Sequence, residues 1–260
     1  MLYLCAMRVS VVNYLNSKPF IYGLRNSPII NEIDLQLDIP STCADKLIAG
    51  EVEIGLVPVT TLSELTEPHI ISNYCIGADG EVASVLLLSE QPIEKIKTVF
   101  LDYQSRTSVM LAEILFEKWW KHAPQFVDAG KDFENEMSGT TAAVVIGDRA
   151  MKLRKKFKYV YDLATVWKKF TTLPFVFACW VANRKLPDDF VNRFNKALGE
   201  GIKNKLLVAE QEKLNYPETD INDYFTNKIS YNFDERKKAA MQLFLSFVSE
   251  RLEKEVMKIV

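Results

Sequence analysis

Strand-like and helix-like segments alternate along almost the whole of this 260-residue chain, and no other feature limits its possible folds as strongly. A β-branched run at 8–13 is followed by helical spacing at 20–24, and strands predicted at 35–39 and 54–59 enclose a second helix at 45–49. A strand–helix–strand order favours parallel strands with helices packed on the sheet. The chain is therefore predicted to be an α/β protein.

The same alternation returns in the middle of the chain and then gives way to helices alone. Strands are predicted at 82–88, 98–101, 142–146, 159–161 and 175–182, and helices at 106–120, 149–153 and 162–170. From residue 187 onward the spacing is helical, and the last segment, 234–255, carries an apolar stripe typical of a helix that packs on a core.

This order predicts two lobes, with apolar strands near 82–88 and 175–182 that cross between them. Lobe 1 is expected to comprise residues 1–86 and 179–260, the N-terminal strands with the C-terminal helices, and lobe 2 residues 87–178. Each lobe should hold a mainly parallel sheet flanked by helices. A ligand cleft is expected between the lobes, with a helical tail at the C-terminus.

The charge balance argues against several classes of partner. The chain has 32 Lys and Arg against 34 Asp and Glu, a formal net charge of -2, so no overall field attracts nucleic acid or an anionic membrane. A basic run at 152–158 lacks interleaved aromatic residues and is interpreted as a solvated helix end. No apolar run reaches the roughly 20 residues of a membrane span, and no secretory signal is recognised, so a cytoplasmic location is expected.

Groups that commonly carry catalysis or bind cofactors are scarce. His69 and His122 are the two histidines, and both are predicted to be surface or structural residues in connecting segments. Metal-ligand spacings and nucleotide-binding glycine motifs are absent, so no metal and no cofactor are expected. The cysteines are scattered and predicted to be buried reduced thiols: Cys5, Cys43, Cys75 and Cys179.

The most informative segment is 101–108, where a strand ends, hydroxyl residues and an arginine follow, and a helix begins. N–H groups at a helix start, together with Ser and Thr hydroxyls, can bind a carboxylate or a phosphate. Arg106 could add a bidentate contact, or it could fix the loop through Asp102. Ser105 or Thr107 could also serve only as a helix cap.

Polar residues follow two further predicted strands. Asn16 and Ser17 come after the first strand, and Gly147 and Asp148 come after the strand at 142–146. Ligands of open α/β sheets bind beyond the carboxyl ends of the strands. The three polar corners, which come from both lobes, are therefore expected to face one cleft.

Several of these segments resemble motifs of the chorismate dehydratase family, which acts in the futalosine route to menaquinone. The matching motifs are VNYLNSKPF at 12–20 with YGL at 22–24, GEVASVLL at 80–87, LD at 101–102 with SRTSV at 105–109, VIGD at 145–148, and LPFVFACW at 173–180 after Trp167. They occur in the family's order and span about residues 8 to 182. Tyr103 and Gln104 depart from the small or polar residues often found there, which bears on loop shape.

The resemblance implies a fold similar to type 2 periplasmic binding proteins and a lyase activity. Such an enzyme removes water from chorismate to give 3-[(1-carboxyvinyl)oxy]benzoate, so chorismate is the expected small-molecule partner, and no cofactor is implied. Loss of the ring hydroxyl and a neighbouring ring hydrogen creates an aromatic ring. The enzyme would therefore mainly have to position a dicarboxylate.

The resemblance also implies site residues. Asn16 and Ser84 match positions that face the substrate and are the candidate catalytic residues. An amide is not a strong base at neutral pH, so Asn16 is expected to orient and polarise the substrate. The substrate's own enolpyruvyl carboxylate is then a candidate base. The candidate substrate-binding residues are Ser17, Ser105, Arg106, Thr107, Ser108, Gly147 and Asp148.

Proteins without catalysis share this fold and are the alternative. A solute-binding protein is expected to carry a signal peptide, and the sensor domain of a transcription factor is expected to accompany a helix-turn-helix segment. A sister enzyme of the same route, which releases dihydroxynaphthoate, matches the opening motif less well. The alternative to chorismate dehydratase is therefore a solute-binding protein or a sensor of small carboxylates.

Overall fold

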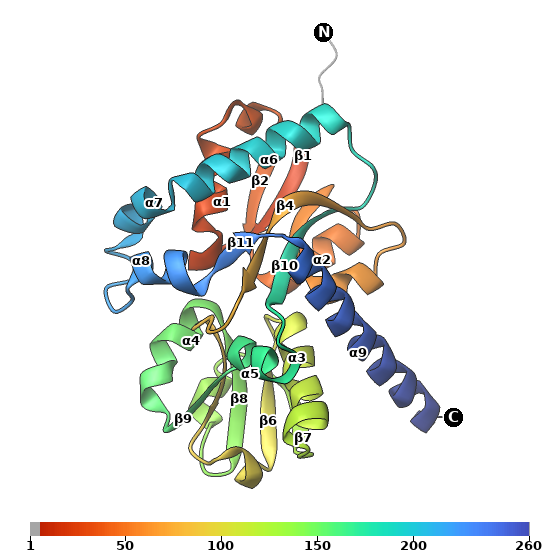
Figure 1. Cartoon of the computed structure of the whole chain (residues 1–260), viewed down its shortest axis with the longest axis vertical. Helices are drawn as coiled ribbons and strands as arrows, with labels where there is room; N and C mark the ends of the chain where they lie inside the picture. The colour runs from red at the N-terminus through yellow and green to blue at the C-terminus, as the bar shows by residue number, and fades with distance from the viewer. Residues whose placement is uncertain (1–5, 260) are drawn as a thin grey trace. The chain divides into compact units, whose positions relative to one another are not determined.

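The computed structural model describes residues 6–259, with side chains through residue 254, and shows two compact units (Figure 1). One unit comprises the described residues through Gly77 together with Phe177–Asp234. The other comprises Ala78–Val176 together with Glu235 and the residues after it. Each unit is built around its own mixed sheet flanked by helices, which confirms the predicted α/β class.

The sheet of the first unit has the strand order β11-β4-β10-β3-β1-β2. β1 (Met7–Val12) pairs in parallel with β2 (Ile33–Asp38) and with β3 (Ile54–Pro58), as the strand–helix–strand order predicts. β10 (Phe175–Ala182) runs antiparallel to β3, and β11 (Ser230–Asn232) runs antiparallel to β4 (His69–Ala78). Antiparallel strands are thus added to a parallel core.

Two glycines allow helices of the first unit to pack unusually closely. The helices of this unit are α1 (Lys18–Arg25), α2 (Pro40–Ile48), α6 (Asp188–Lys203), α7 (Lys205–Glu212) and α8 (Ile221–Asp223). α1 packs against α6. At their crossing, Gly201 faces the Pro19 carbonyl oxygen and Gly23 faces that of Ala197, and neither glycine has room for a Cβ atom.

Gly201→Ala is therefore expected to destabilise the first unit, because its methyl group would overlap the Pro19 carbonyl oxygen and force the two helices apart. Overpacking of this kind costs about 1–3 kcal/mol, which urea unfolding should register. Gly199→Ala is the matched control on the same helix. Its methyl group would meet only the end of the Tyr74 side chain, which can turn aside. Equal losses of stability in the two variants would contradict backbone contact as the cause.

The sheet of the second unit has the strand order β7-β6-β8-β5-β9. β6 (Thr98–Asp102) lies parallel to β7 (Gln125–Ala129) and β8 (Thr141–Ile146), whereas β5 (Val85–Ser89) runs antiparallel to β8 and to β9 (Tyr159–Asp162). The helices of this unit are α3 (Thr107–Leu115), α4 (Gly147–Leu153), α5 (Leu163–Thr171) and α9 (Glu235–Ile259). Because β6 and β8 are parallel neighbours, the ends that lead into α3 and α4 lie at the same sheet edge.

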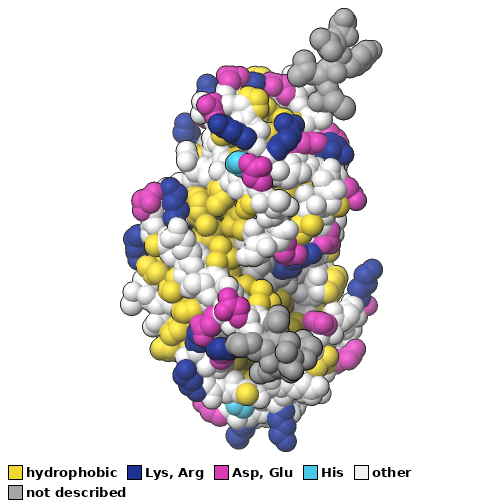
Figure 2. All heavy atoms as spheres, turned by 90° about the vertical axis from the view of Figure 1, so that its right-hand side faces the viewer, with side chains coloured by type: hydrophobic (Ala, Val, Ile, Leu, Met, Phe, Trp, Pro, Cys, Tyr) yellow, Lys and Arg dark blue, Asp and Glu magenta, His cyan; other side chains and the backbone are white. Residues whose placement is uncertain are grey.

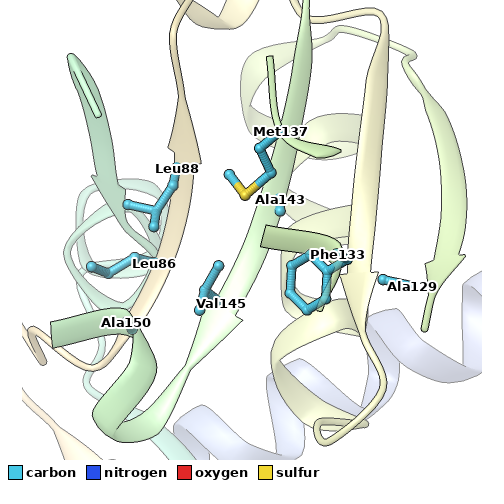
Figure 3. Packing of buried hydrophobic residues seen from close by; sticks show 8 residues of the cluster. All are labelled: Leu86, Leu88, Ala129, Phe133, Met137, Ala143, Val145 and Ala150. Atoms are coloured by element: carbon cyan, nitrogen blue, oxygen red, sulfur yellow. The ribbon is translucent and has the colours of Figure 1, made fainter. Parts of the chain in front are cut away.

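A buried apolar cluster covers one face of this second sheet (Figure 3). Leu86 and Leu88 of β5 lie on the same face as Ala143 and Val145 of β8, because alternate residues of a strand point to opposite sides. The remaining members come from β7, the connection before β8, and α4: Ala129, Phe133, Met137 and Ala150. The cluster thus ties α4 and the 133–137 connection to the sheet.

The extent of the units differs from the predicted lobes in two places. The chain enters the second unit after Gly77 rather than near residue 87, because β5 pairs along its length with β8 and β9. The last helix, expected with the first lobe, belongs to the second unit because α9 packs against α3. Arg251 of α9 contacts Glu113 of α3 at 3.2 Å and Glu117 at 3.3 Å.

The surface carries charges of both signs. Lys and Arg side chains are interspersed with Asp and Glu on the face that Figure 2 shows. The basic residues 154–156 form a 3₁₀ turn after α4 with no buried member, as predicted for a solvated helix end. None of the described helices combines the length and the apolar character needed to cross a bilayer.

Candidate functional site

The β6–α3 corner (residues 102–108) joins the carboxyl end of β6 to the first turn of α3. The Ser105 N–H donates to the Asp102 carbonyl oxygen (3.0 Å), and the Ser108 N–H donates to Ser105 Oγ (3.1 Å). Ser105 thus caps the helix, one of the roles considered for it, and its hydroxyl hydrogen can still be donated to a ligand. Since the side chains of Ser105, Thr107 and Ser108 are all buried, the corner offers uncharged hydroxyl groups in a largely dry setting.

The Asp102 carboxylate holds this corner in place through hydrogen bonds. It is fully buried and accepts hydrogen bonds from the N–H groups of Gln104 (3.0 Å) and Ile146 (3.1 Å). Arg149 Nη2 lies 2.7 Å and 2.6 Å from its two oxygens. Burial acts to raise the pKa of Asp102, and the guanidinium of Arg149 opposes that effect. Arg149 was not among the predicted site residues. For Arg106, which is partly exposed, the sequence had left two roles open: a contact to the ligand, or a contact to Asp102 that fixes the loop.

The β8–α4 corner (residues 146–148) lies beside it at the same sheet edge. Gly147 begins α4 with a φ of 64°, a left-handed conformation that glycine adopts without strain. Its N–H donates to the carbonyl oxygen of Ser84 (2.8 Å). This bond fixes the Ser84 backbone beside Gly147, which stays a candidate substrate-binding residue. Asp148 lies in the first turn of α4 and is partly exposed.

Ser84 immediately precedes β5, and the pairing of Val85 with Ile146 brings it next to Gly147. Its side chain is 1% exposed, and Oγ lies 3.5 Å from the Val82 carbonyl oxygen. Ala83, the residue before it, has a φ of 63°, which is strained for a residue with a Cβ atom. The carboxylate of Asp162, a partly buried residue, stabilises this turn.

Asp162 contacts the chain on both sides of the turn. One carboxylate oxygen accepts from the N–H groups of Val82 (3.0 Å) and Ala83 (2.7 Å), and the other accepts from the Thr165 N–H (2.9 Å) at the start of α5. Burial raises the pKa of Asp162 above its usual range, and the three N–H donors oppose the shift. This carboxylate had been expected only to begin a helix.

The β1–α1 corner of the first unit carries Asn16 and Ser17 in a 3₁₀ turn, Leu15–Ser17. Ser17 is fully buried and donates from Oγ to Asn16 Oδ1 (3.0 Å). The Tyr231 hydroxyl donates to the Asn16 carbonyl oxygen (2.9 Å). Burial raises the pKa of Tyr231 well above its ordinary value, so this donor keeps its proton. Asn16 itself is partly exposed.

The second unit therefore brings most of the predicted residues to one edge of its sheet. They come from the start of β5, the end of β6 and the end of β8: Ser84, Ser105, Arg106, Thr107, Ser108, Gly147 and Asp148. Asn16 and Ser17 lie at the equivalent strand-to-helix corner of the first unit. Arg149, Asp162 and Tyr231, which hold these corners, were missed by sequence reasoning.

Other reactive groups lie apart from these corners. His122 Nε2 is 2.6 Å from the Ile96 carbonyl oxygen, and His69 Nε2 is 3.1 Å from Glu67 Oε1, which confirms structural and surface roles. Cys43, Cys75 and Cys179 are buried, as predicted. Burial raises the pKa of Cys43 to about 12. Cys5 lies outside the described residues. Across residues 6–254, no cluster of His, Cys, Asp and Glu could hold a metal ion.

A cavity of about 430 Å³ lies in the first unit, between the end of α1 and α6. Tyr22, Asn26 and Lys196 are among its lining residues, and none of the predicted site residues reaches it. The cavity is therefore separate from the three polar corners.

The architecture of the two units is that of a periplasmic-binding-protein-like fold. The chain is similar to protein AF1704 of Archaeoglobus fulgidus, with a TM-score of 0.76 and 16% identity over 96% of this chain and 99% of that one. It is also similar to the alkanesulfonate-binding protein SsuA of Xanthomonas axonopodis pv. citri, with a TM-score of 0.65 and 10% identity over 95% and 93%. These likenesses establish the fold.

A family profile described as menaquinone biosynthesis matches residues 7–250, and the chain belongs to that family. A protein of Thermus thermophilus named chorismate dehydratase is 28% identical over 200 residues, which cover 67% of this chain and 71% of that protein. A chorismate dehydratase of Campylobacter jejuni is 25% identical over 248 residues, covering 90% and 94%. The predicted membership of the chorismate dehydratase family is thus confirmed.

Proposed function

We propose that this protein is a chorismate dehydratase, a lyase that converts chorismate to 3-[(1-carboxyvinyl)oxy]benzoate and water in the futalosine route to menaquinone. Membership of the menaquinone biosynthesis family and relatives named chorismate dehydratase support this function. The observation that carries the proposal is a group of buried hydroxyls at one sheet edge: Ser84, Ser105, Thr107 and Ser108. The carboxylates of Asp102 and Asp162 hold the turns around them through backbone N–H groups.

The reaction needs little chemistry from the protein. A base takes the proton from one ring carbon, the C–H electron pair becomes a ring double bond, and the neighbouring C–O bond breaks. The ring hydroxyl leaves as water once it has gained a proton. Because the product ring is aromatic, the enzyme has mainly to hold the substrate in one reactive geometry, which can supply about 7–11 kcal/mol of the barrier.

Uncharged donors suit a substrate with two carboxylates. Thr107, Ser108 and the N–H groups of the first turn of α3 would bind one carboxylate, with Ser105 fixing that turn. Arg106, partly exposed, would add an electrostatic contribution. Asp148, also at a helix start, would approach the substrate only through a hydroxyl or a water, since like charges repel.

Asn16 and Ser84 would act at the reacting ring. Asn16 would orient the leaving hydroxyl through its amide, with Ser17 fixing the amide through the bond to Oδ1. Ser84 would donate to the substrate from a backbone position that Gly147 fixes. The enolpyruvyl carboxylate of chorismate would take the ring proton, since neither histidine lies at a polar corner.

Incubation of the purified protein with chorismate tests the proposal directly. We expect mass spectrometry to detect a product lighter than chorismate by one water and ultraviolet absorbance to detect the aromatic ring. Because SsuA, a binding protein, shares this fold, the competing function is that of a non-catalytic solute-binding protein or sensor of small carboxylates. Unchanged chorismate, together with tight binding by calorimetry, would favour that alternative.

A further inference from the structure

We propose that Arg149 is a positioning residue of the second unit: acting through Asp102, it fixes the β6–α3 corner against the β8–α4 corner. The effect on reaction rate that we expect rests on the proposed function. The effect on the two corners does not.

Asp102 is the point at which the two corners meet. Its carbonyl oxygen accepts from the Ser105 N–H, and its carboxylate accepts from the Gln104 N–H, so both ends of the residue hold the β6–α3 corner. The same carboxylate accepts from the Ile146 N–H on the neighbouring strand. A rotation of this side chain would therefore release both corners together.

Arg149 fixes the orientation of that carboxylate. Its Nη2 contacts both Asp102 oxygens, and its Nη1 lies 2.6 Å from Glu134 Oε1. The guanidinium carbon also lies 5.6 Å from the ring centres of Tyr103 and Phe133. Phe133 belongs to the buried cluster of Figure 3, so the arginine is anchored to the core of the unit.

Such an arrangement contributes more to geometry than to stability. A buried ion pair must recover the free energy lost when its charges leave water, so its net contribution to folding is often small. The planar guanidinium nevertheless fixes the orientation of the Asp102 carboxylate, because it makes several bonds in a fixed geometry that a lysine cannot reproduce. A displacement of about 1 Å in a positioned group can lower a rate by about 100-fold.

Arg149→Lys tests this role while keeping the charge. We expect kcat for chorismate to fall about 10-fold with KM changed less than twofold, because the corners would still bind but with looser geometry. Arg251→Lys is the matched control: Arg251 also bridges two carboxylates, those of Glu113 and Glu117, and lies 6.0 Å from the Phe126 ring in the same unit. Its kcat should stay within twofold of the unmodified protein.

Amide hydrogen exchange at Gln104 and Ile146 provides a readout that does not depend on turnover. Both amides should exchange at least 10-fold faster in Arg149→Lys, and Arg251→Lys should leave them unchanged. Equal exchange in the two variants would overturn the proposal, and so would faster exchange with kcat unaffected. If the unmodified protein left chorismate intact while the exchange difference appeared, the proposed function would fall and the positioning role would stand.

Discussion

Ser84→Ala is expected to lower kcat for chorismate by about 100-fold or more, because the loss of one donor aimed at developing charge in a dry site typically costs a factor of 100 to 1,000. The fold should tolerate the change. The Ser84 side chain is buried, but the strong contact of this residue is made by its carbonyl oxygen, which accepts from the Gly147 N–H and is kept in the variant. Steady-state kinetics with chorismate, beside urea unfolding, would separate the two effects.

Ser89→Ala provides the matched control, because Ser89 is a fully buried serine at the opposite end of β5. Its Oγ accepts from the Gln91 N–H (3.0 Å), so its loss should cost about 1 kcal/mol of stability and leave kcat unchanged. Similar losses of kcat in both variants would indicate a general effect on the strand rather than a role in the reaction.

Asn16 should behave in the same way in the first unit. Asn16→Ala removes the proposed orienting amide but keeps the carbonyl oxygen that Tyr231 contacts, so turnover should fall heavily in a folded protein. Asn13→Ala is its control, since Asn13 is an exposed asparagine of the same corner. Full activity in both Asn16→Ala and Ser84→Ala would remove these two residues from the mechanism.

Local sequence patterns identified the polar corners but not what holds them in place. Ser105, Thr107 and Ser108 could be recognised because a strand end, hydroxyls and a helix start are adjacent in the chain. Arg149 meets Asp102 from 47 residues away, through the pairing of neighbouring strands, and Tyr231 meets Asn16 from 215 residues away. Contacts of this kind depend on the strand order, which no short window of sequence specifies.

Prediction of the strands was limited in the same way, by contacts between residues that are distant in the sequence. Apolar runs predicted the bounds of β8 to within one residue and those of β10 without error. β4 was not predicted, because Ser72, Asn73 and Tyr74 interrupt its apolar pattern. In the structure, β4 lies between β10 and β11, and Ser72 is satisfied by Asn195 Oδ1 (2.9 Å). A polar residue inside a sheet becomes acceptable only when a distant element supplies its partner.

Asp162 links stability and activity most directly, and Asp162→Ala is expected to lower the free energy of unfolding by about 3 kcal/mol or more. Three N–H groups, those of Val82, Ala83 and Thr165, would lose their acceptor, and each buried donor left unsatisfied costs about 1–3 kcal/mol. Ala83 would also be free to leave its left-handed conformation, which would shift Ser84 and lower kcat.

A conservative variant, Asp162→Asn, and a control at another helix cap, Asp220→Ala, test this expectation. Asp162→Asn keeps one acceptor oxygen, so it should lose less stability than Asp162→Ala, while its NH₂ group would face a donor. Asp220→Ala removes an exposed carboxylate that caps α8 with a single bond to the Asp223 N–H (3.0 Å), and should cost only about 1 kcal/mol with kcat unchanged. If Asp162→Ala and Asp220→Ala lost the same stability, the bonds to Val82 and Ala83 would contribute nothing. Ser84 would then have to be held by its pairing with Gly147 alone.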